Sequence, residues 1–280
     1  MQMRLPIVAG LAGVLLVAAG GAVWWIGGPP PSAATGLSSD TGTLPVPPLP
    51  PRVAQGERYE HCLGLLPDHP RGAESFAESW AAADGGAGAA HCLALARIAL
   101  GDPADGAAKL ERIATGSAAP GAARAVVFDQ ASQAWLMAGD AARAFAAATQ
   151  AVTLAPDLPD LLIDRALAAE ALGRWQDAVE DLTHALEGDP RRPDALVLRG
   201  SALRHLDRLA QAREDVDRAL GLDPENAEAL LERGILRQRA ADRGGARADW
   251  ERAIALAPDS QAADLAQQNL ALLDAGPERK

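Results

Sequence analysis

A proline recurs every 34 residues in the second half of the chain, at Pro156, Pro190, Pro224 and Pro258. Each of these prolines closes a similar phrase, such as HALEGDP or RALGLDP. A fixed period of this length is typical of proteins that stack one small structural motif, because a single motif cannot bury its own apolar face. The period divides this part of the chain into four repeats, residues 125–158, 159–192, 193–226 and 227–260.

Within each repeat, a small residue occupies positions 8, 20 and 27. This pattern predicts a helix of about fourteen residues, a short turn, a second helix and a proline that ends it. Gly139 and Gly173 stand in the turn of the first two repeats. Small residues at fixed positions allow the two helices to approach closely. They are Ser132, Ala144, Ala151, Ala166, Ala178, Ala185, Gly200, Ala212, Ala219, Gly234, Ala246 and Ala253.

The period, the small residues, the turn and the terminal proline together resemble the tetratricopeptide repeat. The stretch ALGRWQDAVEDLTHALEGDP, which ends at Pro190, is particularly similar to the second half of that repeat. The resemblance covers residues 125–260 and implies an all-α solenoid of helix-turn-helix repeats. Two positions depart from the family pattern: Arg237 replaces a large apolar residue, and Ala241 replaces the turn glycine.

The repeat pattern continues in weaker form before residue 125. Residues 53–124 contain two degenerate helix pairs by this interpretation, which brings the array to about six repeats. Residues 261–280 form a final amphipathic helix and a polar tail. Such a helix is expected at the end of a repeat array, because it covers the last apolar face.

An uncharged apolar stretch, residues 5–26, lies near the N-terminus. At about 1.5 Å per residue it spans roughly 33 Å as a helix, which is enough to cross a bilayer. We therefore assign residues 1–28 to a transmembrane signal anchor, with Arg4 on the cytoplasmic side. The alternative is a cleaved secretory signal with a small-x-small site at 17–19 or 32–34. Both interpretations export the rest of the chain.

Residues 29–52 are rich in proline and predict an extended linker between the anchor and the repeats. The stretch PVPPLPP at residues 45–51 also fits a ligand for proline-binding domains, an alternative that the spacer role makes unnecessary.

The chain has 37 acidic and 26 basic residues and a net charge of -11, which argues against nucleic-acid binding. No GxSxG, HExxH, P-loop or Rossmann pattern is present. We therefore expect no enzymatic activity, no cofactor and no metal. The alternative is an enzyme with an unrecognised site near the N-terminal repeats, where activity would depend on His61, His91 or a cysteine.

Charged residues at positions 7 and 23 occur together in three repeats, whereas the first repeat has Ala131 and Ala147 at these positions. Both positions lie on packing faces, where an unpaired arginine is costly. Coincidence among surface charges is the alternative explanation. The pattern predicts three structural ion pairs, Arg165 with Asp181, Arg199 with Asp215, and Arg233 with Asp249.

The chain has two cysteines, Cys62 and Cys92, each on the first helix of a degenerate repeat. In a tetratricopeptide array such helices are parallel neighbours. Because export places the pair in an oxidising compartment, we expect a disulfide. The alternatives are two buried free thiols, or a metal site made by the cysteines with His61 and His91.

In the resembled family, positions 2, 5, 9, 12 and 13 of each first helix face a peptide ligand. Carried over to this chain, position 5 is aliphatic in three repeats and suits an apolar-faced peptide or helix. Packing between repeats is the alternative role of this aliphatic line. The Lys and Asn of the family's carboxylate clamp for chaperone tails are missing. The implied groove residues are Val126, Asp129, Gln133, Leu136, Met137, Asp160, Ile163, Leu167, Glu170, Ala171, Asp194, Val197, Ser201, Arg204, His205, Glu228, Leu231, Ile235, Gln238 and Arg239.

These observations together predict a scaffold that binds a protein or peptide partner. We expect it in the bacterial inner membrane through one transmembrane helix, with the repeats in the periplasm, or free in the periplasm or secreted if the signal is cleaved. A self-assembling structural protein, a homo-oligomer of these arrays, is the alternative.

Overall fold

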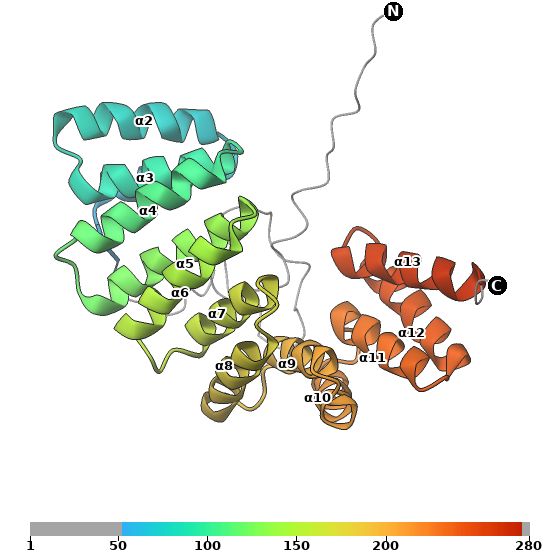
Figure 1. Ribbon diagram of the computed structural model, residues 1–280. Coiled ribbons are helices and arrows are strands. Elements are labelled where there is room, and N and C mark those ends of the chain that lie inside the picture. The colour runs from blue at the N-terminus through green and yellow to red at the C-terminus, as the bar shows by residue number, and fades with distance from the viewer. Residues whose placement is uncertain (1–51, 276–280) are drawn as a thin grey trace, which may run out of the picture. The chain divides into compact units, whose positions relative to one another are not determined.

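The computed structural model describes residues 52–275, and this part of the chain is all-helical (Figure 1). It contains thirteen helices and no strand. The helices are α1 (Glu57–Leu65), α2 (Pro70–Ala83), α3 (Gly86–Ala99), α4 (Pro103–Gly116), α5 (Gly121–Met137), α6 (Ala141–Leu154), α7 (Pro159–Ala171), α8 (Trp175–Gly188), α9 (Pro193–His205), α10 (Leu209–Leu222), α11 (Ala227–Arg239), α12 (Arg243–Leu256) and α13 (Gln261–Ala275).

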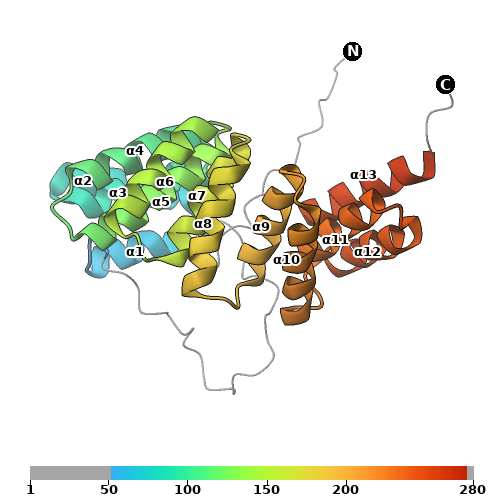
Figure 2. The same ribbon diagram turned by 60° about the horizontal axis from the view of Figure 1, so that its bottom comes forward.

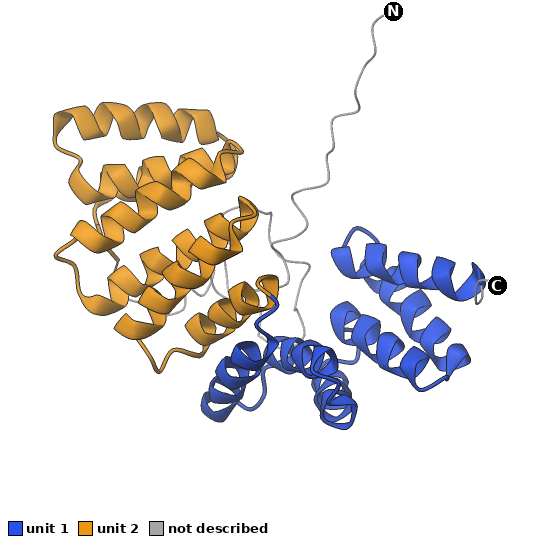
Figure 3. Ribbon diagram, in the orientation of Figure 1, with its two compact units in different colours: residues 1–18, 173–280 blue, residues 19–172 orange. Residues whose placement is uncertain are grey.

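The described residues form two compact units, divided between Leu172 and Gly173 (Figure 3). Unit 2 contains α1 to α7, and unit 1 contains α8 to α13. Within each unit, helices that follow one another in the chain pack side by side, as Figure 2 shows for α3 to α7. The division falls inside the repeat of residues 159–192, between α7 and α8.

The recurring prolines set where the second helix of each repeat ends. In all four repeats the second helix ends two residues before the proline, for example α6 at Leu154 and α12 at Leu256. Proline has no N–H for the helical hydrogen bond and clashes with the preceding turn, so it ends a helix. Pro159 and Pro193 instead begin α7 and α9, where the first N–H groups have no helical partner in any case.

The small residues at positions 8, 20 and 27 are buried in every repeat. Two of them are glycines that no larger residue can replace without movement. A Cβ atom built on Gly234 would lie 2.3 Å from Nε1 of Trp250, and one on Gly200 would lie 2.8 Å from Cγ2 of Val216. In the last two repeats the two helices therefore pack closely, because a large side chain on the second helix meets bare backbone on the first.

The turn between the two helices needs a left-handed residue at position 15 of each repeat. Gly139 and Gly173 supply it in the first two repeats. Asp207 and Ala241 adopt the same conformation in the last two, with φ of 60° and 63°. The departure from the family pattern at Ala241 thus leaves the turn intact but adds backbone strain, because a Cβ is disfavoured there. Asp242 then caps α12 by accepting a hydrogen bond from Gly245 N at 2.9 Å.

The structure describes different parts of the segments assigned to the two ends of the chain. The assigned anchor, residues 1–28, and all of the linker except its last residue lie outside the described residues. Between residues 52 and 275, no helix is both long and apolar enough to cross a membrane. The region of the two degenerate repeats forms the pairs α1 and α2, and α3 and α4, while α13 occupies the place of the expected capping helix.

Candidate functional site

Two of the three expected ion pairs lie within unit 1, and each joins the first and second helix of one repeat. Arg199 donates from Nε and Nη2 to the two carboxylate oxygens of Asp215, both at 2.7 Å. Arg233 donates to Asp249 at 3.0 and 2.7 Å. These hydrogen bonds raise the pKa of both arginines. Asp215 and Asp249 are 5% and 4% exposed, so their charges depend on the guanidinium groups for compensation.

Asp249 receives a second guanidinium that the sequence analysis did not assign. Nη1 of Arg237 lies 2.8 Å from Oδ2 of Asp249 and donates to the carbonyl of Gly245 at 3.2 Å. Arg237 replaces a large apolar residue of the family pattern, and these contacts give it a structural role. For the third expected pair, Arg165 belongs to unit 2 and Asp181 to unit 1, so that pair stays a prediction.

We call the residues carried over from the family's groove positions the first-helix face. In unit 2 most of them are half-buried, while Asp160 and Ala171 are exposed and Asp129 and Ile163 are buried. In unit 1 the same mixture occurs: His205 and Arg239 are exposed, and Val197 and Leu231 are buried. The half-buried members are Val126, Gln133, Leu136, Met137, Leu167, Glu170, Asp194, Ser201, Arg204, Glu228, Ile235 and Gln238.

The aliphatic line at position 5 does not have the exposure of a groove lining. Ile163 is 1% exposed, and Val197 and Leu231 are 6% exposed each. These side chains belong to the packed interior, which was the alternative interpretation of the line. Counting along a helix does not separate a side chain that faces a ligand from one that faces the next helix, because one residue turns the direction by about 100°. The half-buried positions are better candidates for contact with a partner.

In unit 1, the first-helix face contains a charge pair between consecutive first helices. Arg204 on α9 donates from Nε to Glu232 on α11 at 2.7 Å and from Nη2 at 3.2 Å. The neighbouring His205 stacks on the Trp175 ring, with centroids 3.8 Å apart. Burial and the Arg204 charge lower the pKa of His205. Sequence reasoning named Arg204 and His205 but not their partners. The arginine at position 12 and the acid at position 6 of the next repeat could have predicted the pair of Arg204 with Glu232.

In unit 2, the corresponding region contains the acid site, which we define as Asp129 and Gln133 on α5 and Asp164 on α7. Nε2 of Gln133 donates to both carboxyl groups, to Asp129 Oδ2 at 3.2 Å and to Asp164 Oδ2 at 3.1 Å. Asp129 and Asp164 are 6% and 3% exposed. Burial raises the pKa of Asp129 well above its ordinary value, and the charge of Asp164 raises it further.

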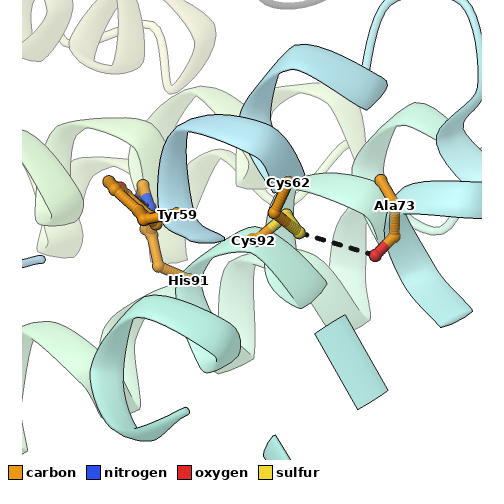
Figure 4. The surroundings of a disulfide bond; sticks show 5 residues. All are labelled: Tyr59, Cys62, Ala73, His91 and Cys92. Carbon is orange, nitrogen blue, oxygen red and sulfur yellow. Dashed lines mark hydrogen bonds between the residues drawn. A yellow bond between two sulfur atoms is a disulfide. The ribbon is translucent and has the colours of Figure 1, made fainter. Parts of the chain in front are cut away.

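The N-terminal part of unit 2 is held by a disulfide between Cys62 on α1 and Cys92 on α3 (Figure 4). One turn away, the phenol oxygen of Tyr59 lies 2.6 Å from Nδ1 of His91. The other ring nitrogen of His91 lies 2.7 Å from Oε1 of Gln130 on α5. Burial lowers the pKa of His91 to about 4 and raises that of Tyr59. This neutral network joins three successive first helices.

The same geometry bears on the alternative metal site. Both sulfur atoms are in the disulfide, so neither is present as the thiolate that a metal binds. Both ring nitrogens of His91 have hydrogen-bond partners, and His61 is exposed with its ring against Phe76. Within residues 52–275, no three His, Cys, Asp or Glu side chains gather in a way that suits a metal ion.

Family models locate the repeats directly. One tetratricopeptide repeat model matches residues 132–203, and a second matches residues 193–226. No curated protein matches the sequence. The matched residues lie in the first three of the four regular repeats and include parts of both units.

Solved structures with a similar fold share little sequence with this chain. The crystal structure of MamA has 14% identity and a TM-score of 0.51, over 59% of this chain and 94% of that one. MamA from Desulfovibrio magneticus RS-1 has 19% identity and a TM-score of 0.53, over 62% and 97%. A chain in the crystal structure of the APC/C hetero-tetramer Cut9-Hcn1 has 15% identity and a TM-score of 0.57, over 76% of this chain and 42% of that one. With the family models, these likenesses show an all-helical fold of tetratricopeptide type.

Proposed function

We propose that the chain is a protein-interaction scaffold that binds a segment of another protein on its first-helix face. Tetratricopeptide repeats generally mediate contacts between proteins, because stacked helix pairs create extended binding surfaces without a catalytic site. The observation that carries the proposal is the composition of this face. In each unit, half-buried apolar side chains lie among charged and polar ones: Leu136 and Met137 in unit 2, and Ile235 in unit 1. Such a composition suits an amphipathic segment.

The proposed location is the periplasmic side of a bacterial inner membrane. Residues 5–26 supply the anchor, and the proline-rich stretch that follows supplies a spacer of roughly 75 Å when extended. Supporting this location, a disulfide joins the two cysteines of the chain, as is usual in an oxidising compartment. Protease accessibility of the repeats in spheroplasts, compared with intact cells, tests this topology.

Site-specific photo-crosslinking tests the binding face. A photoreactive residue at the half-buried Leu167 on α7 is placed in the full-length chain in its native cells, and a matched variant carries it at the exposed Ala146 on α6. We expect one partner protein to be captured from position 167 and not from position 146. Equal capture from both positions, or none from position 167, would mean that this face is not the working surface.

Self-association is a second candidate function, favoured by two leucines on the terminal helix. Leu265 and Leu272 of α13 are 39% and 69% exposed, and they lie two helical turns apart on one side of the helix. Mass measured against concentration tests this function, with Leu272→Glu as the disrupting variant. A monomer at all concentrations rules it out, whereas an oligomer that Leu272→Glu dissociates supports it.

A further inference from the structure

The first described residues are held against the helices of unit 2. A Cβ atom built on Gly88 of α3 would lie 2.7 Å from Cη2 of Trp80 and 3.0 Å from Cβ of Ala54, so Ala54 lies against the bare backbone of this helix. Two residues earlier in the chain, Arg52 donates from Nη1 to the carboxylate of Glu60 on α1. The proline-rich linker therefore joins unit 2 at a fixed point.

This point lies beside the first helices of unit 2. Burial raises the pKa of Tyr59 on α1 and lowers that of His91 on α3, and the charge of Arg52 lowers both, which places the guanidinium near the two side chains. Counted from the left-handed turn residue Gly101, His91 stands at position 5 of its repeat, and its Nε2 atom lies 2.7 Å from Oε1 of Gln130 on α5. The linker thus enters unit 2 at the N-terminal end of the row of first helices that carries the first-helix face.

The segment before this point is apolar and uncharged. Residues 41–51 contain no charged side chain, and five of the last seven are prolines. Such a sequence favours the polyproline II conformation, which loses little conformational entropy when it binds a surface. Because three residues make one turn of this helix, Pro45, Pro48 and Pro51 share one edge. An edge of this kind covers apolar side chains without burying a charge.

The first-helix face of unit 2 offers apolar surface within reach of this segment. Packed helices lie about 8 to 10 Å apart, so α3 and α7, with α5 between them, are separated by about 16 to 20 Å. Residues 45–51 span roughly 20 Å as polyproline II, so a segment that begins next to α3 crosses α5 and reaches α7. Four apolar side chains of this face are half-buried and keep part of their surface exposed: Val126, Leu136 and Met137 on α5, and Leu167 on α7.

We propose that residues 45–51 of the chain itself bind across the first-helix face of unit 2, where a protein partner has to displace them. The proposal rests on the proposed function, since it concerns the same face and adds a competitor for it. Covalent attachment through Arg52 gives the segment an effective concentration on the order of millimolar, so even a weak intrinsic affinity keeps it bound. Binding is thereby restricted to partners that compete with the linker.

Photo-crosslinking in the purified full-length chain, in detergent and without other proteins, tests where the segment binds. A photoreactive residue at Leu167 is expected to give a product that joins α7 to residues 45–51, identified by mass spectrometry. The exposed Ala146 on α6 is the control position and is expected to give no such product. In a mixture of ¹⁵N-labelled and unlabelled chains, a product that joins the two would mean that a second copy occupies the face, which overturns the proposal.

Two triple variants make this test specific. Each replaces three prolines of the linker by serine: Pro45→Ser, Pro48→Ser and Pro51→Ser in the near variant, and Pro29→Ser, Pro30→Ser and Pro31→Ser in the far variant. We expect the near variant to lose the crosslink from position 167 and the far variant to keep it. Thermal unfolding is expected to show that both variants fold. A near variant that folds and keeps the crosslink contradicts the role of these prolines.

Binding of a separate peptide makes the test quantitative. A fluorescein-labelled peptide with the sequence of residues 43–52, TLPVPPLPPR, is titrated with each full-length chain. Because the attached segment competes in the wild type and in the far variant, we expect the near variant to bind the peptide about 10-fold more tightly. Adding Leu167→Gln to the near variant is expected to weaken this binding about 10-fold, since it removes an apolar contact. Equal affinity of the wild type and the near variant overturns the proposal.

The outcomes separate this proposal from the scaffold function. If position 167 captures a partner in cells while the purified chain gives no product with residues 45–51, the scaffold function stands and the competing segment is wrong. If the purified chain gives that product and no partner is captured in cells, the face binds the chain's own segment and the scaffold function loses its support. No preference for position 167 over position 146 in either experiment counts against both.

Discussion

The two units hold their helices together by different chemistry. Unit 1 uses charge: a guanidinium is bound to each of the buried carboxylates Asp215 and Asp249, and another is bound to Glu232. The N-terminal part of unit 2 uses a disulfide and the neutral network around His91. The charge pairs of unit 1 are complete within the chain, whereas the interior of unit 2 depends on redox state and protonation. We therefore expect the stability of unit 2, more than that of unit 1, to change with redox conditions, with pH or with a bound partner.

Removal of the disulfide is expected to give the largest effect. The bond closes a loop with a sequence separation of 30, for which the chain-entropy model gives about 3 to 4 kcal/mol. Because α1 has 9 residues, it is too short to persist without its attachment. In the Cys62→Ser, Cys92→Ser variant, hydrogen exchange should increase in α1 and α3 and stay unchanged in α9 to α12. Equal loss of protection in both units would show that the bond does not act locally.

Breaking one ion pair tests unit 1 in the same way. Arg199→Ala leaves Asp215 buried without its guanidinium, and we expect a loss of about 3 kcal/mol in the free energy of unfolding. Adding Asp215→Ala should recover most of this loss. The first repeat already carries buried alanines at both positions, Ala131 and Ala147. Urea unfolding of the wild type and the three variants measures the coupling, and additive effects would mean that the pair contributes nothing.

The pH dependence of stability distinguishes the two units further. The folded-state pKa of His91 is about 4, below the unfolded value of about 6.5, because burial disfavours the imidazolium. Between these values the unfolded chain binds the extra proton, so stability is lost as the pH falls. We expect a loss of about 2 kcal/mol between about pH 7 and about pH 5.

The His91→Gln variant removes this titration and serves as the reference. Asp129 has a raised pKa and gives the opposite slope, since its folded form holds a proton that the unfolded chain has lost. The difference between wild type and His91→Gln in urea unfolding isolates the contribution of His91. If this difference stays constant from about pH 7 to about pH 5, the burial account of His91 is wrong.

The smallest expected effect concerns the turns. Ala241 in unit 1 holds a left-handed conformation that Gly139 provides without strain in unit 2. We expect Ala241→Gly to raise the free energy of unfolding by about 1 kcal/mol and Gly139→Ala to lower it by a similar amount. Thermal unfolding of both variants checks the signs. A loss of stability in Ala241→Gly would contradict the strain assigned to this turn.

Most helices could be predicted because their signals are local and repeated. The proline after each second helix, the buried small residues and the turn position act within one repeat, so each can be read without knowing the fold. The site was harder to predict. The position-5 residues Ile163, Val197 and Leu231 were assigned to a groove but are buried, because a rotation of one residue separates the two faces of a helix.

The sequence by itself determined the repeat, the helix ends, the close packing at positions 8, 20 and 27 and the pairs of residue types at positions 7 and 23. These features follow from period, residue size and the backbone limits of proline and glycine. Only the tertiary structure decided which polar groups of different repeats meet. Gln133 reaches Asp164 over 31 residues, and His91 reaches Gln130 over 39. Such contacts depend on the rotation and spacing of packed helices, which no local pattern specifies.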